Sequence, residues 1–199
     1  MPLRAHKDMD LPRRFHNPQD GYWHVQVTQG DSYVTTDAGE VLTTILGSCI
    51  AACIRDPQAG VGGMNHFLLA HGCGGDQNAT RYGVNAMEIL INGLLKRGAT
   101  RSRLEAKLFG GASVVPGLSD VGASNASFAE KFLADEGIAL VGGDVRGTSA
   151  RRVQFWPLTG RARQQAVATA DTRLLVEREL VSVRPASTAK QECSDVELF

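Results

Sequence analysis

Short apolar segments separated by glycine and aspartate fill the first third of the chain, a pattern typical of β-strands joined by turns. Residues 22–28 and 41–46 are rich in aromatic, aliphatic and β-branched side chains. Two further apolar segments follow at residues 50–54 and 61–69. The pattern therefore predicts four strands before the middle of the chain.

The last two of these segments flank the sequence Arg55-Asp56-Pro57-Gln58-Ala59-Gly60. Asp-Pro favours turn initiation, and glycine adopts positive φ at little cost. The two strands are therefore expected to pair as a hairpin, which brings the start of the first strand close to the latter part of the second. This arrangement folds Cys49 back toward His66.

The clearest helix is predicted at residues 80–97, where apolar side chains recur at steps of three and four and Gly98 supplies a stop. A second helix is expected at residues 124–136, with Phe128 and Phe132 on one side. Further segments are predicted as strands at residues 104–109, 138–141 and 152–156, and a third helix with poorer apolar spacing is predicted at 171–181. Because strands outnumber helices and the two do not alternate regularly, the expected fold class is α+β.

Length and composition limit the organisation and the partners. The 199 residues suit one domain, expected at residues 22–183, with a flexible N-terminal extension at 1–21 and a flexible C-terminal tail at 184–199. The 21 basic and 21 acidic residues cancel, and no basic stripe is present, so nucleic acid is not an expected partner. The N-terminal residues lack the apolar core of a secretion signal, and the longest apolar stretch, residues 41–54, is shorter than the ~18 residues of a membrane span. A cytoplasmic protein that is not inserted in a membrane is expected.

Cys49 and His66 are the residues with the strongest candidate chemistry. Cys49 follows the glycine turn Gly47-Ser48, where backbone N–H groups can point at a developing oxyanion. An imidazole beside a thiol favours the reactive thiolate. From these residues alone, a packing role for Cys49 and a plain strand position for His66 remain open, and Ser48 serves either the turn or the oxyanion.

A zinc site is the competing use of these side chains. The soft ligands are Cys49, Cys53, His66, His71 and Cys73. Their spacing lacks the paired pattern of zinc modules, so no metal is predicted. Cys53 is expected to pack in the core, because Ala52 and Ile54 flank it in the strand.

The chain resembles the chemoreceptor glutamine deamidases of the CheD family over residues 15–169. The stretches that carry the resemblance are Thr43-Thr44-Ile45-Leu46-Gly47-Ser48-Cys49, Gly62-Gly63-Met64-Asn65-His66-Phe67, Lys107-Leu108-Phe109-Gly110-Gly111-Ala112, Gly142-Gly143-Asp144, Arg151-Arg152-Val153 and Thr159-Gly160-Arg161. The chain departs from the family pattern at Gly122-Ala123-Ser124-Asn125 and Gly147-Thr148-Ser149-Ala150.

This resemblance implies a layered β-sandwich with helices packed outside and a catalytic set of Cys49, His66 and Thr43. Thr43 is assigned from its place six residues before the cysteine, and the adjacent Thr44 is the alternative. The implied reaction is hydrolysis of a receptor glutamine side chain to glutamate and ammonia through a cysteine thioester, without a cofactor. Gly47 and Ser48 would support the turn and the oxyanion.

The implied partners are methyl-accepting chemotaxis receptors as substrates and a chemotaxis phosphatase of the CheC type. A non-catalytic protein that only regulates such a phosphatase is the alternative function. The C-terminal residues Asp195-Val196-Glu197-Leu198-Phe199 alternate acidic and apolar side chains, so a docking peptide and an inert end are both open interpretations.

Overall fold

Two five-stranded sheets form the framework in the computed structural model, which describes residues 13–69, 76–114 and 119–167. Sheet A has the order β1-β2-β4-β9-β10 and comprises Arg14–Asn17, Tyr22–Gln26, Glu40–Leu46, Arg151–Trp156 and Arg161–Ala166. Sheet B has the order β3-β6-β5-β7-β8 and comprises Ser32–Thr35, Val61–Asn65, Ile50–Asp56, Glu105–Gly110 and Ala139–Val145. Both sheets are mixed, because β2 pairs in parallel with β4 and β7 pairs in parallel with β8.

The hairpin expected from the Asp-Pro turn is present as β5 and β6, which pair antiparallel with Cys53 opposite Met64. The carboxylate of Asp56 closes the turn by accepting the backbone N–H groups of Gln58 and Ala59. Gly60 has a φ of 62°, a left-handed conformation that glycine adopts readily. The local sequence therefore sets the register of this pair of strands.

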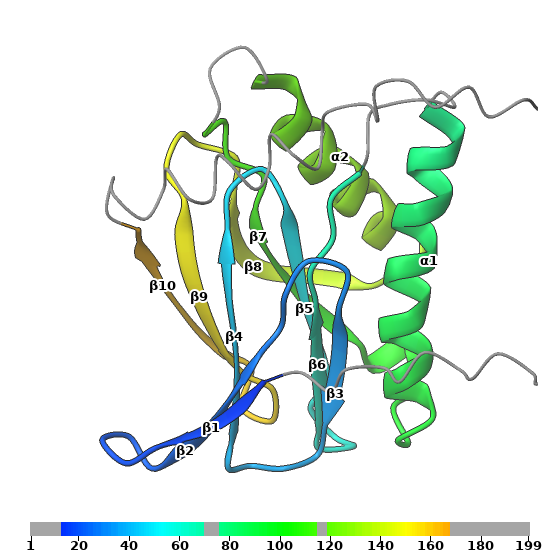
Figure 1. Cartoon of the computed structure of the whole chain (residues 1–199). Coiled ribbons are helices and arrows are strands. Elements are labelled where there is room, and N and C mark those ends of the chain that lie inside the picture. Colours follow the sequence, from blue (N-terminus) through cyan, green and yellow to red (C-terminus); the bar gives the residue numbers. More distant parts are fainter. Residues whose placement is uncertain (1–12, 70–75, 115–118, 168–199) are drawn as a thin grey trace, which may run out of the picture.

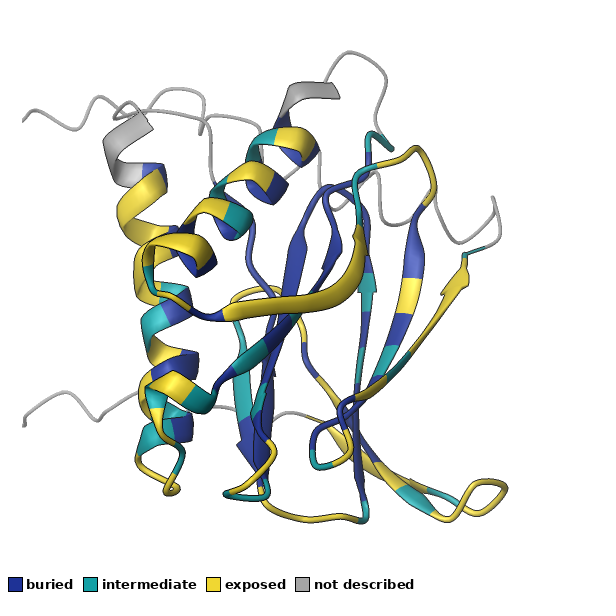
Figure 2. Cartoon of the chain, turned by 180° about the vertical axis from the view of Figure 1, so that it is seen from behind, coloured by how far each residue is buried: buried dark blue, intermediate teal, exposed yellow. Residues whose placement is uncertain are grey.

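The helices α1 (Asp76–Leu95) and α2 (Ser119–Asp135) lie on the same outer face of sheet B, as Figure 1 shows. One apolar core joins these helices to sheet B, and a second fills the space between the two sheets. Figure 2 shows buried positions on the sides of both helices that face the sheet. The expected α+β fold, a layered β-sandwich with helices packed outside, is confirmed.

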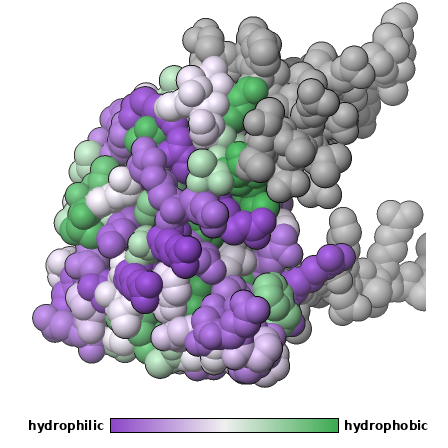
Figure 3. Space-filling view, turned by 90° about the vertical axis from the view of Figure 1, so that its left-hand side faces the viewer, coloured by the Kyte–Doolittle hydropathy of each residue, from purple (hydrophilic) through white to green (hydrophobic). Residues whose placement is uncertain are grey.

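The outer face of sheet A carries no helix within the described residues, and its surface is largely hydrophilic in Figure 3. The edge strand β10 is almost entirely exposed and carries Arg161, Arg163, Gln164 and Gln165. One solvated sheet face with polar side chains is typical of open mixed and antiparallel sheets. No helix in the described part of the chain is long and apolar enough to cross a membrane.

The structure adds elements that the sequence pattern did not predict. Strands β1, β3 and β10 are new, and β1 lies inside the range expected to be an N-terminal extension. The segments predicted at 138–141 and 152–156 are strands, but they do not close one sheet, because β8 belongs to sheet B and β9 to sheet A. The helix predicted at 171–181 lies outside the described residues.

Candidate active site

Cys49 and His66 lie on one face of the β5–β6 pair. Ile50 and Phe67 exchange two backbone hydrogen bonds of 2.9 Å, one residue beyond each candidate. This register makes Cys49 and His66 diagonal neighbours whose side chains leave the sheet on the same side. Both are buried, with 3% and 6% of their surface exposed. The register therefore brings the predicted nucleophile and base together.

Other elements hold the turn at Cys49 through its backbone carbonyls. The Gly47 carbonyl accepts the Ala112 N–H at 2.8 Å, and the Cys49 carbonyl accepts the Gly111 N–H at 2.8 Å. The Ser48 carbonyl between them accepts the Asn125 side-chain amide at 2.8 Å. All three carbonyls of the turn are therefore directed at protein donors, two from the loop after β7 and one from α2.

Gly110, at the end of β7, packs directly against the turn at Cys49 and has to be a glycine. Its φ is 106°, and a Cβ atom there would collide with the carbonyl oxygen of Cys49. The close approach of the β7 backbone to the nucleophile's carbonyl is thus possible only without a side chain. Gly110 and Gly111, in a stretch that carries the family resemblance, accordingly pack their backbone against the Cys49 carbonyl.

The imidazole of His66 is held by a threonine from the opposite sheet. Thr44 Oγ1 on β4 lies 2.9 Å from His66 Nδ1, and Thr44 is buried. Thr43 does not reach this ring. Its hydroxyl donates to the Val25 carbonyl at 3.5 Å, and its own carbonyl accepts the Val27 N–H.

The hydroxyl that lies beside the His66 ring is that of Thr44, the alternative to Thr43 in the sequence analysis. Successive side chains of a strand point to opposite faces of the sheet. In β4, residues Leu42, Thr44 and Leu46 face the interior between the sheets, and Thr43 and Ile45 are less buried. Only the Thr44 hydroxyl can meet a ring that projects from sheet B.

Burial keeps the His66 ring neutral. It lowers the pKa of His66 to about 4, while the main chain of Val27 and the negative charge of Asp31 act in the opposite direction. Within the described residues, the ring's Nε2 atom is buried without a hydrogen-bond partner. A neutral imidazole has one donor and one acceptor nitrogen, so Nε2 can accept a proton in the tautomer in which Nδ1 donates to the Thr44 hydroxyl.

Asn125 is a residue beside the candidate site whose contacts the sequence did not reveal. Its side chain on α2 is fully buried, donates to the Ser48 carbonyl and accepts the Leu69 N–H at 2.9 Å. It thereby joins the turn before Cys49 to the segment after His66. An amide on the same helix side as Phe128 and Phe132, at a spacing of three and seven, is the signal that could have identified it.

The other described cysteine, Cys53, is a core residue as predicted. It is 1% exposed between the sheets, and burial raises the pKa of its thiol. A buried thiol that resists ionisation is a poor nucleophile and metal ligand. Residues His71 and Cys73 lie outside the described residues, and the described ones contain no group of three or more His, Cys, Asp or Glu side chains arranged to hold a metal.

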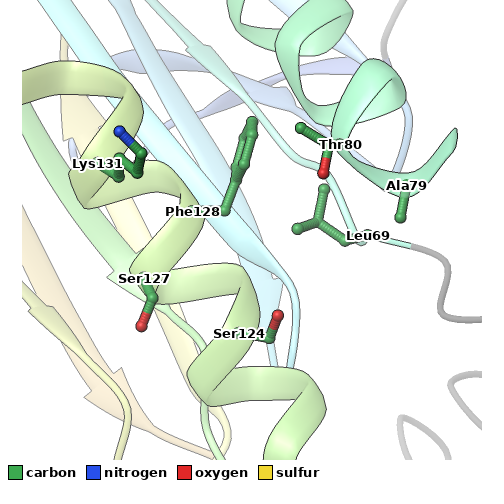
Figure 4. Close-up of a pocket in the computed structure, with 7 residues that line it drawn as sticks. All are labelled: Leu69, Ala79, Thr80, Ser124, Ser127, Phe128 and Lys131. Carbon is green, nitrogen blue, oxygen red and sulfur yellow. The ribbon is translucent and has the colours of Figure 1, made fainter. Parts of the chain in front are cut away.

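A separate cavity of about 260 Å³ lies between α1 and α2 (Figure 4). Its lining residues are Leu69, Ala79, Thr80, Ser124, Ser127, Phe128 and Lys131. None of them is a nucleophile or base candidate, and the cavity is on the helical side of sheet B, whereas Cys49 faces the space between the sheets. The cavity is therefore separate from the candidate site at Cys49 and His66.

Comparisons with known proteins identify the family. A family described as CheD chemotactic sensory transduction matches residues 70–166. A protein of Caulobacter vibrioides is 60% identical over 177 residues, covering 88% of this chain and 92% of its own. A protein of Agrobacterium fabrum is 52% identical over 178 residues, covering 88% and 96%. Both are named "Probable chemoreceptor glutamine deamidase CheD", and at this identity and coverage the chain belongs to the CheD family.

Proposed function

We propose that this protein deamidates glutamine side chains of methyl-accepting chemotaxis receptors, with Cys49 as the nucleophile. The observation that carries the proposal is the buried arrangement of Cys49 beside His66, with His66 anchored by Thr44. The relatives' name supplies the substrate class. A protein that only regulates a phosphatase would not require this thiol–imidazole–hydroxyl arrangement.

His66 acts first as the base. In the tautomer in which Nδ1 donates to the Thr44 hydroxyl, Nε2 carries the lone pair that accepts the proton. The low pKa of His66 means that the neutral ring is the form present at neutral pH. The thiol proton therefore passes to Nε2 as the sulfur attacks, and no long-lived ion pair is needed beforehand.

The sulfur of Cys49 adds to the side-chain amide carbon of the substrate glutamine. In a planar trans peptide the N–H points opposite to the C=O. Since the Gly47 and Ser48 carbonyls are directed at Ala112 and Asn125, the N–H groups of Ser48 and Cys49 point away from those donors. These N–H groups are placed to stabilise the negative oxygen of the tetrahedral intermediate.

Collapse of the intermediate breaks the carbon–nitrogen bond, and His66 returns its proton to the departing ammonia. Water, activated by the neutral His66, then attacks the thioester carbonyl and releases Cys49 with a glutamate on the receptor. Atoms balance without a metal or a redox cofactor. A glutamate methyl ester would form the same thioester, so esterase activity accompanies this mechanism.

The proposal places the enzyme in the cytoplasm, where the helical hairpins of the receptors carry their glutamines. The same protein can also bind a CheC-type phosphatase, because such binding would use the protein surface and not the buried Cys49 and His66. The test is mass spectrometry of a receptor cytoplasmic fragment before and after incubation with the protein, because each deamidation raises the mass of a peptide by about one unit.

The assay compares two cysteine variants, with Cys49→Ala as the test and Cys53→Ala as its matched control. The first removes the nucleophile and should abolish deamidation while the protein stays folded. The second removes the thiol from the core and should retain turnover at temperatures where it is folded. Deamidation by a clean Cys49→Ala preparation would refute the mechanism.

A further inference from the structure

A closed turn at residues 28–31, between β2 and β3, lies beside the active site. The Thr28 N–H and hydroxyl both donate to Asp31 Oδ2, at 2.9 and 2.6 Å. The Asp31 N–H donates back to the Thr28 carbonyl at 2.9 Å. Three hydrogen bonds between the first and last residues give this turn one defined shape.

Backbone hydrogen bonds fasten the turn to the base. The Gly30 N–H donates to the His66 carbonyl at 2.7 Å, and the His66 N–H donates to the Asp31 carbonyl at 3.1 Å. Gly30 has a φ of 92°, and a Cβ there would lie 3.8 Å from the hydroxyl of Tyr82 on α1. The turn is thus positioned by His66 and bordered by α1.

Gln29 stands between these fixed residues and points its amide at the nucleophile. Cys49 Sγ donates to Gln29 Oε1 at 3.6 Å. Gln29 is exposed and Cys49 is buried, so the amide borders the solvent side of the sulfur. This is the side from which a glutamine of another protein must arrive.

In the resting enzyme the Cys49 thiol is protonated, and it donates to the amide oxygen of Gln29. Rotation about the last side-chain bond of glutamine is soft and exchanges the amide oxygen with the NH₂ group. After the thiol has lost its proton, the NH₂ group is the favourable partner for negative charge beside the sulfur. Oxyanion sites commonly combine backbone N–H groups with one side-chain amide.

We propose that Gln29 is a further catalytic residue, whose side-chain NH₂ donates to the oxyanion formed when Cys49 adds to the substrate amide. This inference rests on the deamidase function proposed above. It gives the intermediate one donor from the turn at residues 28–31 in addition to the backbone donors at Ser48 and Cys49. The hydrogen bonds of the turn hold the Gln29 backbone beside Cys49, so only rotation of the amide is needed to present its NH₂ group.

The test compares Gln29→Ala and Gln29→Glu with Gln165→Ala, an exposed glutamine on the edge strand β10. For each variant, kcat and KM are measured on a folded receptor fragment, together with the melting temperature and the extent of Cys49 alkylation by iodoacetamide. Loss of one oxyanion donor should lower kcat about 10²–10³-fold in Gln29→Ala, with little change in KM. Gln29→Glu should be at least as slow, because a carboxylate has no N–H and repels the oxyanion.

Unchanged melting temperature and complete alkylation in the same variants would separate this role from a structural one. A kcat for Gln29→Ala within about threefold of the wild type would overturn the proposal. Peptide mass spectrometry showing glutamate at position 29 in the wild type and glutamine there in Cys49→Ala would also overturn it, since Gln29 would then be a substrate of its own nucleophile. Absence of receptor deamidation by the wild type would instead refute the proposed function, and with it this role.

Discussion

The buried amide of Asn125 offers the sharpest test of how α2 supports the nucleophile. Asn125→Ala removes the donor to the Ser48 carbonyl and the acceptor for the Leu69 N–H in one step. Asn125 is fully buried, so alanine removes one hydrogen bond from each of two backbone groups in a site that excludes water. The change tests the stability of the fold and the position of Cys49 together.

The expected cost follows from these two contacts. Loss of the hydrogen bond of a buried polar group costs about 1–3 kcal/mol, so the loss of two should lower the free energy of unfolding by about 2–6 kcal/mol. For a domain of this size, that loss corresponds to a fall in melting temperature of roughly 4–24 °C. Since the Ser48 carbonyl is no longer held, kcat should also fall at temperatures where the variant is folded.

Urea denaturation measures the free energy of unfolding. Receptor deamidation, assayed below the melting temperatures of the wild type and the variant, measures the fall in kcat. Asn92→Ala is the matched control, because Asn92 is an exposed amide on α1 that donates to Glu88 at 3.4 Å. It should change stability by less than about 0.5 kcal/mol. A loss below about 1 kcal/mol in Asn125→Ala, with normal kcat, would refute the supporting role of this amide.

Three further predictions concern the base, its anchor and the substrate. Because the pKa of His66 falls from 6.5 to about 4 on folding, the unfolded chain binds a proton that the folded protein excludes, and the free energy of unfolding should decrease as the pH drops through this range. The decrease should reach about 3 kcal/mol, His66→Gln should remove most of it, and equal pH profiles for the two proteins in urea denaturation would contradict the assignment. Thr44→Val keeps the shape of the side chain but removes the hydroxyl on His66, so it should lower kcat on the order of tenfold or more, whereas Thr43→Val should leave kcat nearly unchanged; the opposite result would return the role to Thr43. Binding energy from the receptor helix positions the scissile amide, so kcat/KM for free glutamine should be lower by orders of magnitude than for a folded receptor fragment, and comparable values would indicate a small-molecule amidase.

The sequence by itself determined the parts of the site that depend on local geometry. The Asp56-Pro57 turn dictates the β5–β6 hairpin, and antiparallel register then places Cys49 and His66 on one face. The recurrence of apolar residues at steps of three and four likewise predicted α1. Both the hairpin and the helix depend on residues that are close together in the chain. Strands β1, β3 and β10 were missed because they are short or exposed and carry little apolar alternation.

Only the tertiary structure decided which residues from other elements complete the site. Strand alternation predicts that Thr43 and Thr44 face opposite ways, but the packing of sheet A on sheet B determines which one meets His66. Likewise, Asn125 reaches Ser48 only because α2 packs on sheet B, and Gln29 reaches Cys49 only because its turn is fastened to His66. These contacts join residues 20 to 77 positions apart, and the packing of whole layers, which no short sequence pattern encodes, brings them together.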